Sequence, residues 1–339
     1  MRGGKASDPK TMWDLNERDE SVDIALPPDG RLRLRAPGDL FELAKGWVPL
    51  MPSPEGAAGD GSTRAYIDMA RAEPHVRNFA AAERDAVAGA PAFEQDGVRV
   101  WVRGDRAFAA GEAAACDIDL LARRARLYVA ETPLDTARTE VFSLLSAAAA
   151  LLVGRLGGAL VHAGAVAPGD GPATLLVGGS GSGKTTTCAN LVRAGWRGLA
   201  DDQVVLTRDD SGAIVAHGFA RPFGLDTGWP DGAPRGQKRR VDPRRLAGGG
   251  LIPSAPLGQI ALPRVTHDAA TEARPASPAQ TLAALLQQSA WLTYDPAAAK
   301  PLFDLLAAAA TLGGRHLRLG LDAFAEETAP LTAAFADGV

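Results

Sequence analysis

The chain has few cysteines, few aromatic residues and no excess of positive charge, and each shortage excludes a class of protein. Two cysteines, Cys116 and Cys188, in 339 residues cannot form a disulfide framework. Lys and Arg number 36 against 40 Asp and Glu, a net charge of −4, whereas a nucleic-acid coat protein needs a broad basic field. The polar N-terminus lacks the apolar core of a signal peptide, and the uncharged stretch between Glu140 and Arg155 is too short to cross a bilayer. We therefore expect a cytoplasmic protein without nucleic-acid or membrane partners.

The chain is instead rich in apolar residues and turn formers. Apolar residues make up 46% of it, enough to bury a sizeable core, and 38 glycines and 24 prolines interrupt its elements. Residues 1–30 show little periodicity and predict a loose arm, whereas Arg31–Arg35 alternates and predicts a half-exposed strand. Further strands are expected at Ala65–Met69, Val98–Arg103 and Leu127–Ala130. We predict a small α+β domain over residues 1–135, which carries no chemical motif, and a second domain over residues 136–339.

Several elements of the second domain can be predicted from local patterns. Residues 140–156 predict a buried helix, and Ala159–Val166 with Ala173–Val177 predict a hairpin of buried strands. Nearer the C-terminus, Ser277-Pro278 and Asp295-Pro296 are typical helix starts. Arg315–Leu319 alternates and predicts an edge strand.

A glycine-rich loop follows the second strand of the predicted hairpin. Residues 178–185 fit the pattern G-x-x-x-x-G-K-[ST], and a predicted helix, Lys184–Ala194, follows them. Glycines let backbone N–H groups close around phosphate oxygens, and the helix N-terminus adds partial positive charge. The lysine supplies charge to the β- and γ-phosphates, and the Thr185 hydroxyl can ligate Mg²⁺. ATP and Mg²⁺ are thus the expected cofactors, and the expected nucleotide-binding residues are Gly178, Gly179, Ser180, Gly181, Ser182, Gly183, Lys184, Thr185 and Thr186.

Phosphoryl transfer also needs a carboxylate for the metal and a base for the nucleophile. Asp201 and Asp202 lie in an apolar strand region soon after the loop. If the strand bends or ends there, one can hold the metal while the other faces the incoming hydroxyl; the alternative is a polar turn between strands. His162, inside the predicted strand Ala159–Val166, is either a hydrogen-bonded core residue or part of the site.

Three blocks, LVHAGAVA, LLVGGSGSGKTTT and GLADDQVVL, resemble the catalytic domain of HPr kinase/phosphorylase and its relatives, a superfamily that includes ATP-dependent phosphoenolpyruvate carboxykinase. The likeness covers His162 to Leu206 and continues more weakly in Gly218–Leu225 and Pro256–Pro263. It implies an α/β fold: a P-loop kinase domain of the HPr kinase C-terminal type, with a mixed sheet and flanking helices, preceded by the small α+β domain.

The same resemblance implies roles for five residues. It places His162 beside the phosphates and the metal, and it makes Lys184 the phosphate lysine and Thr185 the metal-binding hydroxyl residue. Asp201 matches the aspartate that deprotonates the acceptor serine, and Asp202 matches its metal-associated neighbour. The catalytic residues expected are therefore Asp201, Lys184 and His162, with Thr185 and Asp202 as metal ligands.

The sequence departs from HPr kinases proper at two points. They carry Ser-Glu after the lysine, where this chain has Thr185-Thr186, and this chain has no counterpart of their Glu-x-Arg-Gly-Leu-Gly segment. The resemblance is therefore to a divergent branch, which includes kinases found beside lasso-peptide biosynthesis genes, and it leaves the acceptor unassigned. HPr kinases assemble as hexamers, so the resemblance also suggests a homo-oligomer.

A basic segment spans residues 235–245, with six basic residues and one acid in eleven positions. It is either a solvated loop or a mobile loop that closes on nucleotide phosphates or receives an acidic peptide. The candidate phosphate or substrate contacts are Arg221, Arg235, Lys238, Arg239 and Arg240.

The function these features favour is that of an HPr-kinase-like phosphotransferase, which moves the γ-phosphoryl group of ATP to a Ser or Thr hydroxyl of a peptide or protein. Three alternatives stay open. One is a small-metabolite kinase on the same fold. Another is a transporter-type ATPase, although its Leu-Ser-Gly-Gly-Gln signature and a strand ending in Asp-Glu are missing from the sequence. The third is a nucleotide-sensing module without turnover.

Overall fold

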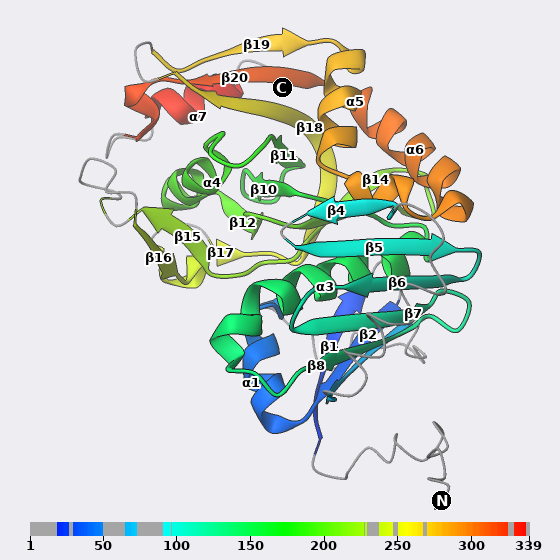
Figure 1. Cartoon of the computed structure of the whole chain (residues 1–339). Coiled ribbons are helices and arrows are strands. Elements are labelled where there is room, and N and C mark those ends of the chain that lie inside the picture. Colours follow the sequence, from blue (N-terminus) through cyan, green and yellow to red (C-terminus); the bar gives the residue numbers. More distant parts are fainter. Residues whose placement is uncertain are drawn as a thin grey trace, which may run out of the picture.

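Two large β-sheets, one from each half of the chain, make up most of the mixed α/β fold (Figure 1). The computed structural model describes residues 19–26, 30–49, 65–72, 91–95, 97–226, 228, 237–246, 250–266, 270–324 and 329–336. Among these residues the first sheet has eight strands, the second has ten, and a separate pair is formed by β15 (Phe223–Asp226) and β16 (Lys238–Val241).

The first sheet runs in the order β1-β2-β3-β8-β7-β6-β5-β4. Its strands are β1 (Glu20–Leu26), β2 (Gly30–Ala36), β3 (Ala65–Arg71), β4 (Phe93–Gln95), β5 (Val98–Arg103), β6 (Arg106–Ala110), β7 (Ala114–Asp119) and β8 (Arg124–Val129). The strands predicted at Arg31–Arg35, Ala65–Met69, Val98–Arg103 and Leu127–Ala130 are confirmed as parts of β2, β3, β5 and β8, although β8 ends at Val129. The prediction of a loose arm over residues 1–30 is wrong for residues 20–26, which form β1; residues 1–18 lie outside the described part.

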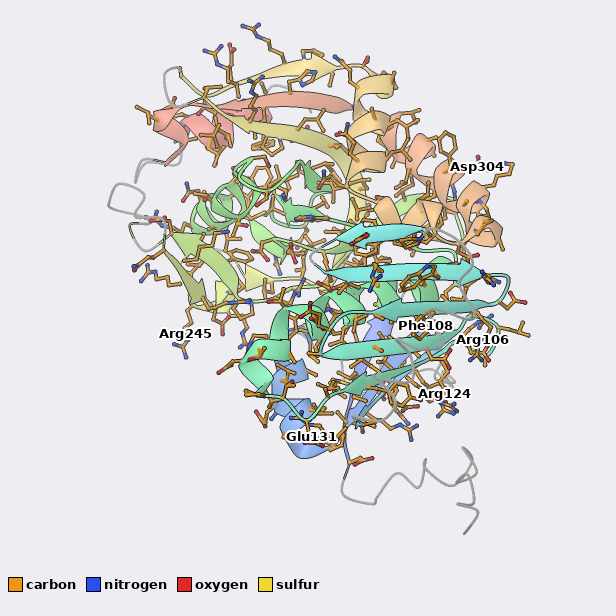
Figure 2. The ribbon with its side chains drawn as sticks, in the orientation of Figure 1. Arg106, Phe108, Arg124, Glu131, Arg245 and Asp304 are labelled. Atoms are coloured by element: carbon orange, nitrogen blue, oxygen red, sulfur yellow. The ribbon has the colours of Figure 1, made fainter. Side chains whose placement is uncertain are left out.

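The two faces of the first sheet differ in polarity because its strands alternate. On β2, Leu32 and Leu34 are fully buried, while Arg31, Arg33 and Arg35 lie on the opposite face. There the carboxylate of Asp68, itself buried, pairs with Arg35 at 2.7 Å and with Arg124 at 2.9 Å. Figure 2 shows the side chain of Arg124 on this sheet, well away from the second sheet.

Helices α1 (Gly38–Lys45) and α3 (Leu134–Gly154) cover the apolar face of the first sheet. The predicted helix over residues 140–156 is confirmed, although it begins earlier and ends at Gly154. At 21 residues α3 is long and apolar enough to cross a membrane, but most of it is buried between the two sheets, against β7, β8 and β9. The predicted domain boundary between residues 135 and 136 therefore falls inside a helix that packs on both halves of the molecule.

The second sheet runs in the order β17-β12-β10-β11-β18-β14-β13-β9, with β20 joining β18 to β19. Its strands are β9 (Ala159–Val161), β10 (Ala163–Ala167), β11 (Ala173–Val177), β12 (Arg197–Ala200), β13 (Val204–Arg208), β14 (Ile214–Gly218), β17 (Gly250–Leu251), β18 (Ser254–Val265), β19 (Glu272–Ala276) and β20 (Gly314–Leu319). The edge-strand prediction for Arg315–Leu319 is wrong, because β20 has a partner strand on each side.

The predicted hairpin is confirmed for β10 and β11, which pair antiparallel. The prediction of one continuous strand over Ala159–Val166 is wrong, because the chain changes partners at His162. Before this residue β9 pairs with β13, and after it β10 pairs with β11 and β12. His162 therefore occupies a break between two strands and not the middle of one.

Helices flank both faces of the second sheet (Figure 1). They are α4 (Lys184–Arg193), α5 (Pro278–Gln287), α6 (Pro296–Ala310) and α7 (Ala329–Ala336). The predicted helix starts are confirmed: Ser277 forms a capping box with Gln280, and the Asp295 carboxylate accepts a hydrogen bond from the N–H of Ala297. Alternate residues of β11 pack in opposite directions, so the strand before the glycine-rich loop is buried on both sides.

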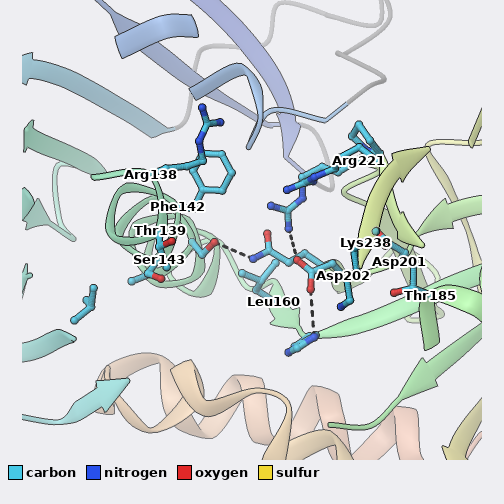
Figure 3. Close-up of a pocket in the computed structure, with 18 of the residues that line it drawn as sticks. Arg138, Thr139, Phe142, Ser143, Leu160, Thr185, Asp201, Asp202, Arg221 and Lys238 are labelled. Atoms are coloured by element: carbon cyan, nitrogen blue, oxygen red, sulfur yellow. Dashed lines mark hydrogen bonds and ion pairs between the residues drawn. The ribbon is translucent and has the colours of Figure 1, made fainter. Parts of the chain in front are cut away.

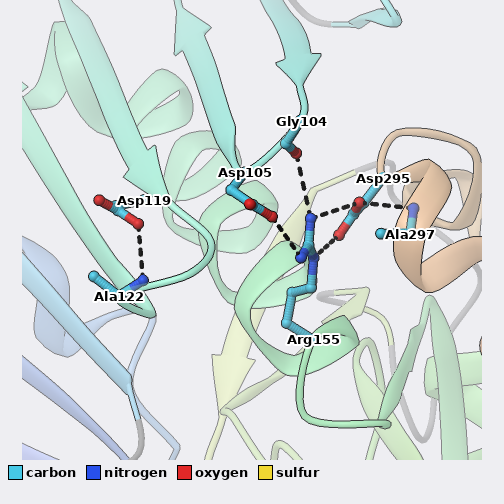
Figure 4. Close-up of polar contacts among 7 residues, drawn as sticks. All are labelled: Gly104, Asp105, Asp119, Ala122, Arg155, Asp295 and Ala297. Atoms are coloured by element: carbon cyan, nitrogen blue, oxygen red, sulfur yellow. Dashed lines mark hydrogen bonds and ion pairs between the residues drawn. The ribbon is translucent and has the colours of Figure 1, made fainter.

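The two halves are also joined by a polar contact at the C-terminal end of α3 (Figure 4). Arg155 donates to Asp105 Oδ1 at 2.9 Å and to the carbonyl oxygen of Gly104 at 3.3 Å, both in the turn between β5 and β6. The same guanidinium donates to both carboxylate oxygens of Asp295, the residue that caps α6. One arginine thus links α3, the first sheet and a helix of the second half.

Candidate active site

The glycine-rich loop between β11 and α4 has a backbone that needs glycine at two positions. Gly181 and Gly183 have φ values of 78° and 101°, in the left-handed region that other residues rarely adopt. A Cβ on Gly183 would also lie 2.6 Å from Cδ1 of Leu319 on β20. The conformation of the loop and its close packing against β20 therefore both require glycine at position 183.

Lys184 is buried beneath this loop and folds back onto it. Its ammonium donates to the carbonyl oxygens of Gly178 at 2.6 Å and Gly179 at 3.0 Å. Burial lowers the pKa of Lys184, whereas the negative charges of Asp202 and Asp201 raise it.

The loop also fits the phosphate group that its sequence predicts. The hydroxyl of Ser182 is buried and has no hydrogen-bond partner among the residues described, and neither has that of Thr187 one turn into α4. Buried hydroxyls without partners are costly, and a phosphate oxygen can accept from them. With the loop N–H groups at the start of α4, residues 178–185 are suited to hold the phosphates of a nucleotide.

The two adjacent aspartates lie just beyond the end of β12, which stops at Ala200. Asp201 is buried, with 7% of its surface exposed, while the Asp202 side chain is 47% exposed. The backbone is fixed there, since the N–H of Ala163 donates to the carbonyl oxygen of Asp202 at 3.1 Å. Because the strand has ended, both side chains reach the same cavity.

Two basic side chains flank the Asp202 carboxylate (Figure 3). Arg221 Nη2 donates to Oδ2 at 2.5 Å, and Nε2 of His162 lies 3.2 Å from Oδ1. The break between β9 and β10 brings His162 to this position. The backbone N–H of His162 donates to the carbonyl oxygen of Gln288 at 2.8 Å. The sequence-predicted residues His162, Asp202 and Arg221 thus form one contiguous group.

Burial shapes the protonation of this group. It raises the pKa of Asp201 to about 7, the Asp202 charge adds to the rise, and Arg221 opposes it. Burial also lowers the pKa of His162, although the Asp202 charge opposes that change. A carboxylate with a pKa near neutrality can accept a proton from a reacting hydroxyl and release it again.

All these groups open onto a cavity of about 640 Å³ between the two halves of the chain. One part of its lining comes from the loop, the acid pair and β16: His162, Thr185, Asp201, Asp202, Arg221 and Lys238 to Arg240. The other part comes from α3 and the first sheet, and includes Phe93, Thr139, Phe142 and Ser143. The structure brings the predicted base and metal ligands together in this one cavity.

The basic segment differs in part from its prediction. Lys238, Arg239 and Arg240 line the cavity, but they belong to β16, which pairs with β15, so the prediction of a mobile loop is wrong for them. Arg235 lies outside the described residues. Arg245 projects at the outer side of this strand pair (Figure 2).

Three residues that were not predicted from the sequence, Gln203, Ser146 and Trp47, connect the acid pair to the first half of the chain. Gln203, next to the two aspartates, donates through Nε2 to the Ser146 hydroxyl on α3 at 2.9 Å, and Trp47 Nε1 donates to the same oxygen at 3.0 Å. The one available signal was Ser146 among the alanines and leucines of the second half of α3.

A metal ion at this site would take some of its ligands from the phosphates of a bound nucleotide. No cluster of three or more His, Cys, Asp or Glu side chains suited to a metal is present in the described part of the chain. Mg²⁺ in nucleotide sites is typically bound by one or two carboxylates together with phosphate oxygens and waters. Thr185 and Asp202 fit that donor set, and both line the same cavity.

Comparisons with known proteins identify no family for this chain. No model of a protein family and no curated protein matches the chain. Among solved structures, the HPr(Ser) kinase/phosphatase from Coxiella burnetii is a weak neighbour, 12% identical, with 52% of this chain and 91% of that chain covered and a TM-score of 0.29. The likeness is distant, and a TM-score this low supports no argument about the fold or the site of this chain.

Proposed function

We propose that this chain is an ATP-dependent kinase that transfers the γ-phosphoryl group to the hydroxyl of a Ser or Thr in a peptide or protein. The observation that carries the proposal is the convergence of Thr185 with Asp201 and Asp202 on one cavity. Phosphoryl transfer requires a binding site for the triphosphate, a metal site and a base in one place. Positioning of the reactants and electrostatic stabilisation supply most of the rate enhancement.

Each residue of the site has a role in this reaction. The loop N–H groups hold the phosphates, and Lys184 exchanges its two loop carbonyl partners for phosphate oxygens. Thr185 and Asp202 would hold Mg²⁺, which neutralises charge on the triphosphate when bound. Arg221 and His162 orient the Asp202 carboxylate from either side.

Asp201 accepts the proton of the acceptor hydroxyl. The hydroxyl oxygen forms a bond to the γ-phosphorus while the bond between that phosphorus and the bridging oxygen of ADP breaks. The proton passes to the Asp201 carboxylate, whose raised pKa suits it for this transfer. The products are a phosphorylated acceptor and ADP.

The test uses [γ-³²P]ATP, Mg²⁺ and a degenerate library of peptides that contain Ser or Thr. The wild type should label peptides, and Asp201→Asn should reduce labelling at least a hundredfold while ATP binding stays within about threefold. Asp209→Asn is the matched control, because Asp209 lies at the exposed hairpin tip between β13 and β14. Labelling that survives Asp201→Asn would remove Asp201 as the base, and rapid hydrolysis without any acceptor would indicate an ATPase instead.

A small-metabolite kinase is the second candidate. The cavity volume of about 640 Å³ lies within the range of pockets that enclose small ligands. If the peptide library is not labelled, the same assay with a pool of small hydroxylated compounds, read by mass spectrometry, tests this alternative.

A further inference from the structure

The cavity extends well past the acid pair, toward the first half of the chain. Figure 3 shows Thr139, Phe142 and Ser143 on α3 across the cavity from Asp201 and Thr185. From the glycine-rich loop it is Thr185, at the metal end, that lines the cavity. This space therefore lies on the side of the loop where an acceptor hydroxyl has to meet the γ-phosphate.

We propose that α3 and the hairpin of β4 and β5 form the acceptor subsite, and that this subsite takes a peptide segment whose Ser or Thr lies beside an aromatic side chain. The proposal rests on the kinase function proposed above and specifies its substrate class. It assigns the first half of the chain, in which the sequence shows no chemical motif, to substrate recognition.

An aromatic wall supports the first part of this proposal. Phe93 of β4, Phe142 of α3 and Trp291 of the short helix before α6 all line the cavity, and each is partly exposed. The Phe93 and Trp291 ring centroids are 6.3 Å apart. Phe93 and Trp291 thus form one aromatic pair on the cavity, and Phe142 adds apolar surface from α3, so an aromatic side chain can pack against this part of the lining.

An unpaired acceptor supports the second part. Gln203 lines the cavity and is 8% exposed, and its Oε1 atom has no hydrogen-bond partner among the described residues. The other end of its amide is held by Ser146, which also accepts from Trp47. The amide is therefore anchored at one end, and a ligand that offers a hydrogen-bond partner to its other end would remove the cost of leaving that end unpaired.

These two features together favour a peptide over a simple alcohol. A peptide offers backbone N–H groups beside an aromatic side chain and the acceptor hydroxyl in one short segment. A small alcohol with the same ring could fill the aromatic wall but would leave Gln203 Oε1 unpaired, and such sites discriminate strongly against ligands that lack the expected donor.

The experiment measures saturable binding of N-acetyl-seryl-phenylalanine amide by NMR saturation transfer, with Mg²⁺ and a non-hydrolysable ATP analogue present. N-acetyl-serine amide lacks the ring, and 2-phenylethanol lacks the amides. Phe142→Ala should weaken dipeptide binding at least tenfold, and Ser143→Met, which fills the space without removing a packed ring, should do the same. Phe303→Ala is the control, because Phe303 is 41% exposed on α6 and does not line the cavity. Affinity for the ATP analogue should stay within twofold in all variants.

The outcomes separate the two proposals. If the wild type does not bind the ATP analogue, the kinase proposal itself fails. If it binds the analogue but shows no saturable dipeptide binding, or if Phe142→Ala and Ser143→Met bind the dipeptide like wild type, the acceptor subsite is wrong. Binding of 2-phenylethanol or N-acetyl-serine amide as tightly as the dipeptide would overturn the aromatic-peptide assignment.

Discussion

Arg221 holds the carboxylate of Asp202 in a hydrogen bond of 2.5 Å, and the arginine itself is almost fully buried. Its guanidinium lies over the ring of Phe219 at 5.9 Å from the centroid. Because His162 contacts the other oxygen of the same carboxylate, the Asp202 side chain is held from two sides. In the proposed function this carboxylate is a metal ligand that is oriented before the metal binds. A pre-oriented ligand avoids the cost of ordering a side chain during binding.

Replacement of Arg221 by methionine tests this relationship. Arg221→Met keeps a long side chain over Phe219 but removes the ion pair, so Mg²⁺-dependent ATP binding should weaken at least tenfold. The free energy of unfolding should change by no more than about 1–2 kcal/mol, because the half-exposed Asp202 carboxylate can be hydrated instead. Calorimetric titration with and without Mg²⁺ and urea denaturation measure the two effects. Arg244→Met is the control, since its pair with Asp242 is exposed; equal ATP binding by both variants would show that Arg221 does not support the metal ligand.

The glycine-rich loop and the helix starts could be predicted because their signals are local. A glycine with positive φ, a lysine at the start of a helix and a serine that caps one each act within a few residues. The hairpin of β10 and β11 was predictable for the same reason, since a short polar turn separates two apolar runs.

Contacts between distant segments could not be predicted in this way. The hydrogen bond from Gln203 to Ser146 joins residues 57 positions apart, and no sequence pattern indicates that these two residues are partners. The break at His162 arises because β9 and β10 have different partner strands, which depends on the position of β13. The basic run at residues 238–240 is a strand because β15 pairs with it. The hydrogen bond, the break and the strand each depend on contacts with segments that are distant in the sequence. A single sequence carries little information about such contacts.

Two glycines offer a matched test of the loop. Gly183 and Gly195 both have positive φ, of 101° and 93°, but a Cβ would meet Leu319 at the first position and nothing within 4 Å at the second. Gly195→Ala should therefore cost about 1 kcal/mol of unfolding free energy and leave ATP affinity unchanged. Gly183→Ala should cost more and lower ATP affinity at least tenfold, as measured by urea denaturation and nucleotide titration. Similar ATP affinities in the two variants would show that the loop does not bind the nucleotide.

The contact of Arg155 with Asp105 and Asp295 should stabilise the junction of the two halves (Figure 4). Arg155→Ala leaves the Asp295 carboxylate, which is 4% exposed, without its charged partner, so the free energy of unfolding should fall by about 3 kcal/mol. Lys300→Ala removes an exposed pair with Asp304 and should cost no more than about 0.5 kcal/mol. Urea denaturation of both variants provides the comparison. A loss as small for Arg155→Ala as for Lys300→Ala would mean that this junction contributes little to stability.

His217 should make the stability of the protein depend on pH. It lies in β14, where its Nε2 is 3.0 Å from the Thr207 hydroxyl, and burial lowers its pKa to about 4. An unfolded histidine titrates near 6.5, so between about pH 6.5 and pH 4 the unfolded chain binds more protons and stability falls as the pH falls. This residue should therefore contribute a loss of about 2 kcal/mol between pH 7.5 and pH 5.0.

His217→Gln removes the titrating group and should reduce the difference in unfolding free energy between pH 7.5 and pH 5.0 by about that amount. The difference between the two pH values is the quantity to compare, because the substitution itself changes stability at both. His316→Gln is the control, since His316 is exposed on β20 and should leave the difference unchanged. If His217→Gln loses as much stability on acidification as the wild type, then His217 is protonated in the folded state at pH 5.0 and is not shielded from water as the structure indicates.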